Sequence, residues 1–257
     1  YLVSTLLSLI SFCVFVANAT GKDSESLVIR NVTVVNADAT LSKKTLNVLI
    51  AQGKIQAIGT RAFKADKVID GTGQYLIPGL IDTHVHLRGV PGVPDGELEQ
   101  TDFYQQAAAQ IPRSYLYAGF TTLLDLVNTK TFIDNWNSQS IAPKAYFCAP
   151  APIPGGYPIV NIPDEALQKL DAARYFLHDR HSHSHLDFAD PADHTPAHLV
   201  AAMKQDGALC AKVFYEKGFG ARKNLPVPSE AIVRELVKEA HKKDLPFFLH
   251  GNSQESY

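Results

Sequence analysis

The feature that most constrains this chain is an alternation that begins at residue 75. From there on, short runs of almost continuous apolar residues alternate with longer amphipathic stretches. Strands that are buried on both faces have such runs, and when helices join them they form parallel β/α units. We expect five of these strands, at residues 76–86, 119–127, 144–151, 207–215 and 245–251.

The amphipathic stretches between these strands predict helices at residues 101–118, 164–179, 195–206 and 229–243. The last is the clearest, because Ile232, Leu236, Val237 and Ala240 recur at helical spacing behind a Ser229 cap. An open doubly wound sheet and an incomplete (β/α)8 barrel both fit the pattern, since a whole barrel needs eight strands and typically ~250 residues. The order of elements alone does not separate the two.

Residues 26–74 have a different hydrophobic pattern, in which apolar residues do not recur at helical spacing. The segments 27–36, 46–60 and 67–76 are rich in β-branched residues, and a Gln52-Gly53 turn divides the middle one. A β unit of about fifty residues buries too little apolar surface to be stable alone, so we expect it to pair with another segment.

The first nineteen residues carry no charge, and their apolar run ends in Ala17-Asn18-Ala19. That ending is typical of a secretory signal peptide, although the run is almost long enough for a membrane anchor. We favour a signal peptide at residues 1–19, and hence a secreted or periplasmic protein with no stable membrane anchor after cleavage. Because the sequence starts at Tyr1 and lacks a positive n-region, we expect it to begin inside that signal peptide.

Charge and cysteine content narrow the functional classes. The formal net charge is −2 and no basic block occurs, so a nucleic-acid partner is not expected. Cleavage of the signal peptide would leave Cys148 and Cys210. Both lie in apolar runs, and we expect buried free cysteines rather than a disulfide, because two cysteines alone form no framework pattern.

Two histidines close the first strand of the β/α part. His84 and His86 are two residues apart, so both side chains point to the same side of the strand, where Asp82 joins them. Their Cα atoms would be about 6.6 Å apart, a separation at which two imidazoles can reach one metal ion. Taken alone, such a pair is as compatible with a solvated surface pair as with a metal site.

Three more polar residues fall near the C-terminal ends of expected strands, where chemistry sits in β/α proteins. Lys212 has Ala, Val and Phe around it, which makes a buried ammonium costly; a lysine that snorkels from the strand edge is the alternative. His250 ends the fifth strand, where a capping or hydrogen-bonded histidine is the alternative. Asp125 we expect to be structural, satisfying a neighbouring loop.

Several passages resemble the amidohydrolase superfamily, metal-dependent hydrolases that include ureases, dihydroorotases and imidazolonepropionases. The passages are VIDGTGQYLIPGLIDTHVHL (68–87), YLYAGFTTLLDLVN (115–128), AKVFYEKG (211–218) and FFLHGNSQES (247–256). The resemblance implies an α/β fold with a TIM-like (β/α)8 barrel, of which residues 75–257 would supply about five strands. Residues 26–74 would be the N-terminal part of a small β-sandwich domain.

The resemblance also implies a metal centre of one or two divalent ions, such as Zn²⁺. His84 and His86 would hold one ion, His250 the second, and Lys212 would bridge them once CO₂ has converted it to a carbamate. An apolar strand lowers the pKa of a lysine, which is the direction that carbamate formation needs. Asp82 and Tyr215 are further candidates for contacts with the ligands or the substrate.

The implied activity is hydrolysis of carbon–nitrogen bonds in a small-molecule substrate (an amide, cyclic amide or dipeptide-like compound) by metal-activated water. A non-catalytic scaffold of the same fold and a lactone or phosphoester hydrolase are the alternatives. The superfamily's strand-six histidine and catalytic strand-eight aspartate would lie beyond Tyr257. We therefore expect no catalytic residue in these 257 residues and activity only in the parent chain. Homo-oligomer formation is left open.

Residues 178–198 contain six histidines between the third and fourth expected strands. A polar loop over the mouth of the active site and a separate metal-binding tract are both compatible with this composition. We favour the solvated loop, because the spacing follows no single-site template.

Overall fold

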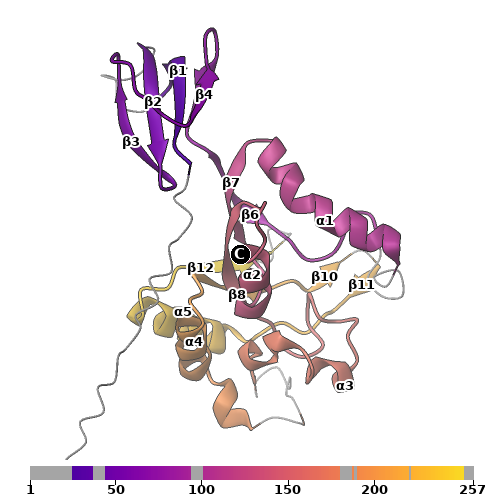
Figure 1. The fold of residues 1–257 in the computed structure, drawn as a ribbon. Helices are drawn as coiled ribbons and strands as arrows, with labels where there is room; N and C mark the ends of the chain where they lie inside the picture. The colour runs from indigo at the N-terminus through magenta and orange to yellow at the C-terminus, as the bar shows by residue number, and fades with distance from the viewer. Residues whose placement is uncertain are drawn as a thin grey trace, which may run out of the picture. The chain divides into compact units, whose positions relative to one another are not determined.

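The computed structural model describes residues 25–36, 44–93, 101–179, 187, 190–219 and 221–251. The expected signal peptide lies outside these residues. The chain divides into two compact units, Tyr1–Pro78 and Gly79–Tyr257 (Figure 1). Within the part that the structure describes, no helix combines the length and the apolar character needed to cross a membrane.

The first unit is a β-sheet with strand order β3-β2-β1-β4, in which β5 also pairs with β1. Its core consists of Val32, Val34, Leu46 and Val48. The strands are β1 (Leu27–Val34), β2 (Lys44–Ala51), β3 (Lys54–Gly59), β4 (Lys67–Asp70) and β5 (Tyr75–Leu76).

The turn between β2 and β3 is the one that the sequence predicts. Gln52 has a φ of 52° and Gly53 a φ of 68°. Two successive residues with positive φ make a two-residue turn whose twist matches that of the flanking antiparallel strands. The hairpin is therefore fixed locally.

The second unit is built on a five-stranded sheet with the order β12-β9-β8-β7-β6. Every neighbouring pair in it is parallel, which confirms the α/β fold and a partial TIM-like barrel. A short antiparallel pair, β10 (Gly218–Phe219) and β11 (Arg222–Lys223), follows β9. The sheet strands are β6 (Leu80–Val85), β7 (Phe120–Asp125), β8 (Lys144–Ala151), β9 (Cys210–Phe214) and β12 (Phe247–His250).

Hydroxyl side chains begin the four longer helices. Thr101, Thr129, Thr195 and Ser229 each accept a hydrogen bond from a backbone N–H in the first turn, as favoured N-caps do. Three of these helices were expected, whereas α2 was not. The helices are α1 (Asp102–Tyr117), α2 (Lys130–Asn137), α4 (Pro196–Gln205) and α5 (Glu230–Lys242), and the 3-10 turn η3 (Pro191–His194) precedes α4.

The prediction of a single helix over residues 164–179 is wrong. The chain forms the short helix α3 (Asp164–Leu167) and then a 3-10 turn, η2 (Asp171–Tyr175). Tyr175, Phe176 and Leu177 are consecutive and all buried. A surface helix buries only one face, so it cannot bury three successive side chains. Tyr175 and Leu177 join the main core, while Phe176 joins a second cluster.

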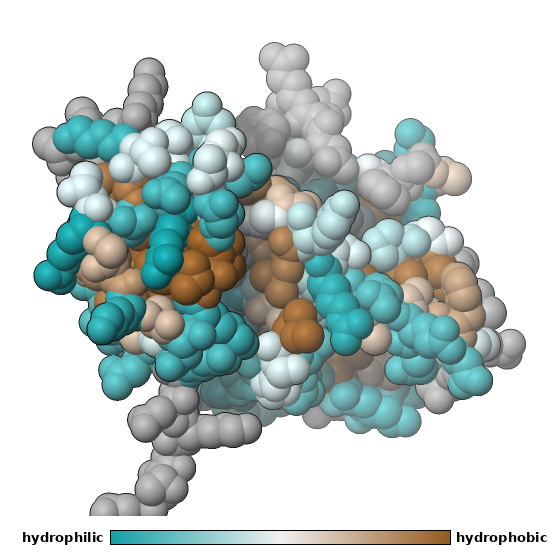
Figure 2. Space-filling model, turned by 45° about the horizontal axis from the view of Figure 1, so that its top comes forward, coloured by the Kyte–Doolittle hydropathy of each residue, from teal (hydrophilic) through white to brown (hydrophobic). Residues whose placement is uncertain are grey.

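The main core lies between the sheet and the helices, with Leu123, Leu199, Met203 and Leu236 fully buried. The outer strands β6 and β12 keep large apolar side chains at the surface, among them Ile81, which is 63% exposed. On the face drawn in Figure 2, hydrophobic residues are visible between hydrophilic ones.

Cys148 and Cys210 form a disulfide between β8 and β9, so the expectation of free cysteines is wrong. The two residues are direct partners in the parallel register. Their Cα atoms are 4.4 Å apart, within the range that a disulfide spans. The pairing depends on the register of two strands that are 62 residues apart in sequence, which a spacing pattern does not reveal.

Candidate metal and active site

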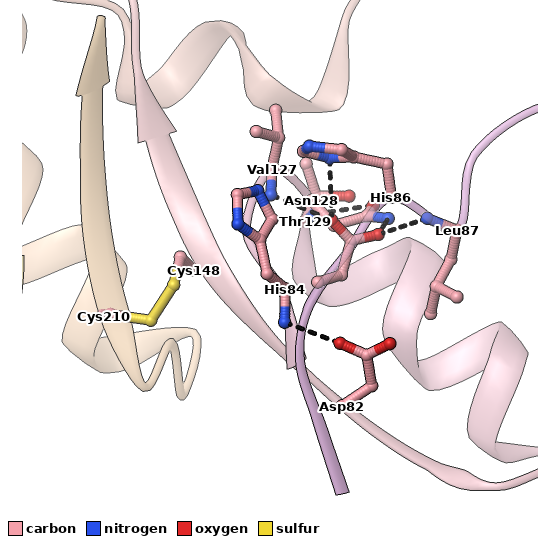
Figure 3. Close-up of polar contacts among 10 residues, drawn as sticks. Asp82, His84, His86, Leu87, Val127, Asn128, Thr129, Cys148 and Cys210 are labelled. Carbon is pink, nitrogen blue, oxygen red and sulfur yellow. Dashed lines mark hydrogen bonds and ion pairs between the residues drawn. A yellow bond between two sulfur atoms is a disulfide. The ribbon is translucent and has the colours of Figure 1, made fainter. Parts of the chain in front are cut away.

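His84 and His86 lie at the end of β6, the first strand of the barrel. Their ring centroids are 5.5 Å apart and the rings are nearly perpendicular, at 78° (Figure 3). Both residues are exposed. The carboxylate of Asp82 accepts a hydrogen bond of 3.0 Å from the backbone N–H of His84, so it stabilises the strand end that carries the pair.

Asp125, at the end of β7, is fully buried and joins two loops. Its Oδ2 accepts hydrogen bonds from the Leu87 N–H at 2.8 Å and from Asn128 Nδ2 at 2.7 Å. Its Oδ1 accepts from the Val127 N–H at 2.9 Å. The expected structural role is thus confirmed. The same Oδ1 lies 3.8 Å from His86 Nδ1, so Asp125 also places its carboxylate beside a candidate ligand, which the sequence reasoning missed.

A cavity of about 220 Å³ lies at the C-terminal ends of the strands. His86, Lys212 and His250 all line it, together with Asp125. Lys212 comes from β9 and is 3% exposed, and His250 comes from the neighbouring strand β12. The structure therefore brings three of the four expected metal ligands to one cavity, while the fourth, His84, faces His86.

The surroundings disfavour the charged form of these three groups. Burial lowers the pKa of Lys212, an effect that the negative charge of Asp125 opposes. Burial also lowers the pKa of His250, and the positive charge of Lys212 adds to that effect. For His86, burial lowers the pKa and Asp125 opposes the change. Imidazoles bind metals in their neutral form, so the lowered pKa values of His86 and His250 suit a role as metal ligands.

Aromatic rings hold His250 in place. The Tyr157 ring stacks on it at 4.8 Å with an interplanar angle of 22°, and the Phe214 ring lies 5.8 Å away. His250 Nε2 is buried and has no hydrogen-bond partner among the described residues. Buried polar atoms are almost always paired, so this nitrogen is suited to a ligand that the polypeptide itself does not supply.

The imidazoles of His84, His86 and His250 are donors that suit a divalent metal ion. Across residues 25–251, as far as the structure describes them, no three His, Cys, Asp or Glu side chains lie close enough to hold a metal ion. The remaining candidate for a metal ligand is Lys212, whose side chain forms no hydrogen bond or ion pair with the described residues. An ammonium would repel a cation, so the site needs Lys212 in a neutral or carboxylated form.

The remaining residues singled out from the sequence lie elsewhere. Tyr215 follows β9 and donates its backbone N–H to the His250 carbonyl at 2.9 Å, but its side chain does not line the cavity. Sequence reasoning missed five residues of the cavity wall: Arg88, Val127, Tyr157, Pro158 and Phe214. Arg88 follows the His-x-His pair by two residues, a proximity that could have indicated it.

The histidine-rich stretch contributes nothing to this cavity within the described residues. His194 is buried, and its Nδ1 lies 2.7 Å from the Phe176 carbonyl oxygen. His198 lies beside Asp193 at 3.6 Å. His178 lines a separate cavity beside α4 and α5. The other three histidines lie outside the described residues.

Comparison with known proteins gives a consistent result. Residues 75–257 match the sequence model described as the amidohydrolase family. A dihydroorotase of Thermoanaerobacter sp. (strain X514) is 38% identical over 110 residues, which cover 42% of this chain and 23% of that protein. One from Thermus aquaticus is 34% identical over 108 residues, which cover 42% and 22%. The chain thus spans less than a quarter of these relatives.

Solved structures show the same fold at low identity. A Xaa-Pro dipeptidase with bound methionine has a TM-score of 0.59 at 17% identity, covering 90% of this chain and 58% of that one. A prolidase complexed with N-methylphosphonate-L-proline has a TM-score of 0.62 at 16% identity, covering 90% and 57%. Aspergillus niger ochratoxinase has a TM-score of 0.59 at 18% identity, covering 91% and 57%.

Proposed function

This chain belongs to the amidohydrolase family, and from that premise we propose that the whole protein is a metal-dependent hydrolase of carbon–nitrogen bonds in small amides. The observation that carries the proposal is the cavity at the strand ends, where His86, Lys212 and His250 converge and burial lowers the pKa of each. Groups shifted in this way, gathered in one cavity, are typical of functional sites.

His84, His86, Lys212 and His250 would hold one or two divalent ions, of which Zn²⁺ suits imidazole ligands. When bound, such an ion would polarise the substrate carbonyl and lower the pKa of a water molecule towards neutrality. The orphaned, buried Nε2 of His250 supports its place in the ligand set.

Lys212 would act as a carbamate. Its neutral Nζ attacks the carbon of CO₂ and releases one proton, which leaves a carboxylate on the side chain. The burial of Lys212 at 3% exposure and its lowered pKa both favour the neutral amine that this reaction requires. The new carboxylate would supply the anionic oxygens that the imidazoles lack.

The other residues of the cavity would position these groups and the substrate. The Asp125 carboxylate lies beside His86, with its Oδ1 3.8 Å from Nδ1, as carboxylates beside ligating histidines commonly do. Tyr157 and Phe214 pack on His250 and exclude water from that side. Arg88 adds a fixed positive charge at the wall, which favours substrates with a carboxylate.

The substrates that we propose are dipeptides or N-acyl amino acids. The Xaa-Pro dipeptidase among the structurally similar proteins carries a name that fits a dipeptide substrate. We also propose that the protein is secreted or periplasmic, since its first nineteen residues resemble a signal peptide.

The test compares His84→Ala with His198→Ala in the whole protein. His198 is the matched control, because it is also an exposed histidine but lies outside the proposed ligand set. We expect His84→Ala to lose zinc, measured by elemental analysis, together with hydrolysis of a dipeptide panel, and His198→Ala to keep both. Loss of zinc only in His198→Ala would move the metal to the histidine-rich stretch. Zinc binding at His84 without hydrolysis would indicate a non-catalytic scaffold.

The carbamate has its own measurement. Protein equilibrated with ¹³C-labelled bicarbonate should show a carbamate carbon signal that is lost in Lys212→Met. The control Lys217→Met removes a nearby lysine that does not line the cavity and should keep the signal. A spectrum without the signal in the zinc-loaded wild type would refute the carbamate.

A further inference from the structure

A second cavity, of about 330 Å³, adjoins the candidate metal site. The two cavities share Arg88, Val127 and Pro158 as lining residues, so they border one another at these side chains. A substrate held at His86 and Lys212 would reach this second space by extending past these three side chains.

The walls of the second cavity are mostly apolar. Two of its polar residues, Asn128 and Thr129, are buried and already hydrogen-bonded within the protein, Asn128 to Asp125 and to the Thr129 N–H. Lys169 and Asp171 are exposed, and their charges are opposite. The apolar lining residues are Val127, Pro150, Pro152, Pro158, Ile159, Ile162, Leu170, Ala172 and Phe176.

The segment that forms much of this wall is rigid. Prolines recur through residues 150–163, and each fixes its own φ. Successive turns add hydrogen bonds from the Gly156 N–H to the Ile153 carbonyl at 3.1 Å and from the Ile159 N–H to the Gly156 carbonyl at 3.0 Å. A Cβ on Gly156 would lie 2.8 Å from the Pro226 carbonyl oxygen, so the segment packs closely on the loop between β11 and α5.

We infer that this second cavity, the acyl pocket, binds an apolar group of the substrate next to the scissile carbon–nitrogen bond. The inference rests on the proposed function and narrows it to substrates with a bulky apolar acyl or aminoacyl part. An apolar cavity of about 150 Å³ admits a benzene ring. The acyl pocket at about 330 Å³ therefore has room for an aromatic or branched group. Because its walls are preformed, binding orders few side chains.

The first experiment measures kcat/KM of the zinc-loaded whole protein on N-acetyl, N-butyryl and N-hexanoyl amino acids. We expect a gain of about fourfold for each methylene that enters the pocket. Ala172→Trp fills the pocket and should abolish the gain. Its control is Ala166→Trp, a partly buried alanine in α3 that does not line the pocket.

A second pair of variants guards against misfolding of the tryptophan variant. Ile162→Ala widens the pocket and should reduce the gain per methylene. Ile141→Ala removes the same atoms from an isoleucine that is 52% exposed and lies outside the pocket, so the gain should stay. If the gain in kcat/KM per methylene is equal in wild type, Ala172→Trp and Ile162→Ala, the acyl pocket is refuted while the proposed function stands.

The third measurement does not depend on activity. Calorimetric titration of metal-free protein with acetate, butanoate and hexanoate should show affinity that rises with chain length in wild type and stays flat in Ala172→Trp. If this slope appears but no carbon–nitrogen substrate is hydrolysed, the pocket stands and the proposed function fails. If affinity is independent of chain length in wild type, the pocket is refuted.

Discussion

The carboxylate of Asp125 lies where the loops after β6 and β7 meet, and its removal is the sharpest test of how the site is supported. It accepts hydrogen bonds from the Leu87 N–H, the Val127 N–H and Asn128 Nδ2, at 2.7 to 2.9 Å. Asp125→Ala would leave these donors without that acceptor. Leu87 and Asn128 are 4% and 2% exposed, so water has little access to replace it.

The expected loss follows from those contacts. A hydrogen bond to a charged group contributes about 1.5–3 kcal/mol, and a buried donor left unpaired costs about 1–3 kcal/mol. With two well-buried donors affected, Asp125→Ala should lower the free energy of unfolding by about 3–5 kcal/mol. The control is Asp134→Ala in α2, whose ion pair with Lys130 is more than half exposed and should contribute little to the free energy of unfolding.

Urea denaturation measures both changes. Trp136 is the one tryptophan in the sequence and is 5% exposed in the main core, so its fluorescence reports the unfolding of this unit. A loss of less than about 1 kcal/mol for Asp125→Ala would refute the reasoning, because a buried carboxylate with three donors cannot then be the tie between the loops.

Other outcomes follow from single features. Replacing Cys148 and Cys210 by alanine should lower the free energy of unfolding by about 4 kcal/mol, since the disulfide closes a loop with a sequence separation of 62; an unchanged urea midpoint would contradict this. Burial lowers the pKa of His250, so the unfolded chain takes up its proton near pH 6.5 and the folded chain only at lower pH. The free energy of unfolding should therefore fall as the pH drops below about 6.5. In the His250→Gln variant it should fall less steeply over the same denaturation series. Gly79→Ala would place a Cβ 2.0 Å from Thr121 Oγ1 and should cost about 1–3 kcal/mol in thermal or urea melts, which Thr121→Gly should restore.

Local patterns in the sequence predict much of the second unit. The strand expected at residues 144–151 is β8 with the same bounds, because a buried parallel strand has an unbroken apolar run. Helix α5 begins behind the expected Ser229 cap, and its Leu236 and Ala240 are buried as their spacing predicts. Features of this kind depend on neighbours within one or two turns.

The missed elements depend on contacts between distant residues. Helix α2 has only eight residues, so the period that buries Ile133 and Trp136 is too short to recognise. The break after α3 follows from two separate cores that divide Tyr175 and Phe176 between them. Neither core can be predicted from local sequence patterns, because each is formed by residues that are distant in the sequence.

The site shows the same division. Positions at strand ends indicate His84, His86, Lys212 and His250, because the ends of parallel strands meet at one edge. The stacking of Tyr157 on His250 could not be predicted, since it depends on the path of a proline-rich segment after β8.

The disulfide has a consequence for how this protein can diverge. Lengthening a loop normally raises the entropic free-energy cost of bringing its ends together, by about 0.6 kcal/mol for each doubling of its length. Cys148 and Cys210 keep the ends of the segment between β8 and β9 together in the unfolded chain as well as in the folded one. Insertions there change both states alike and leave the folding equilibrium nearly unaltered. The segment that forms the acyl pocket wall and contains the histidine-rich stretch can therefore vary in length while the strand register beneath Lys212 is retained.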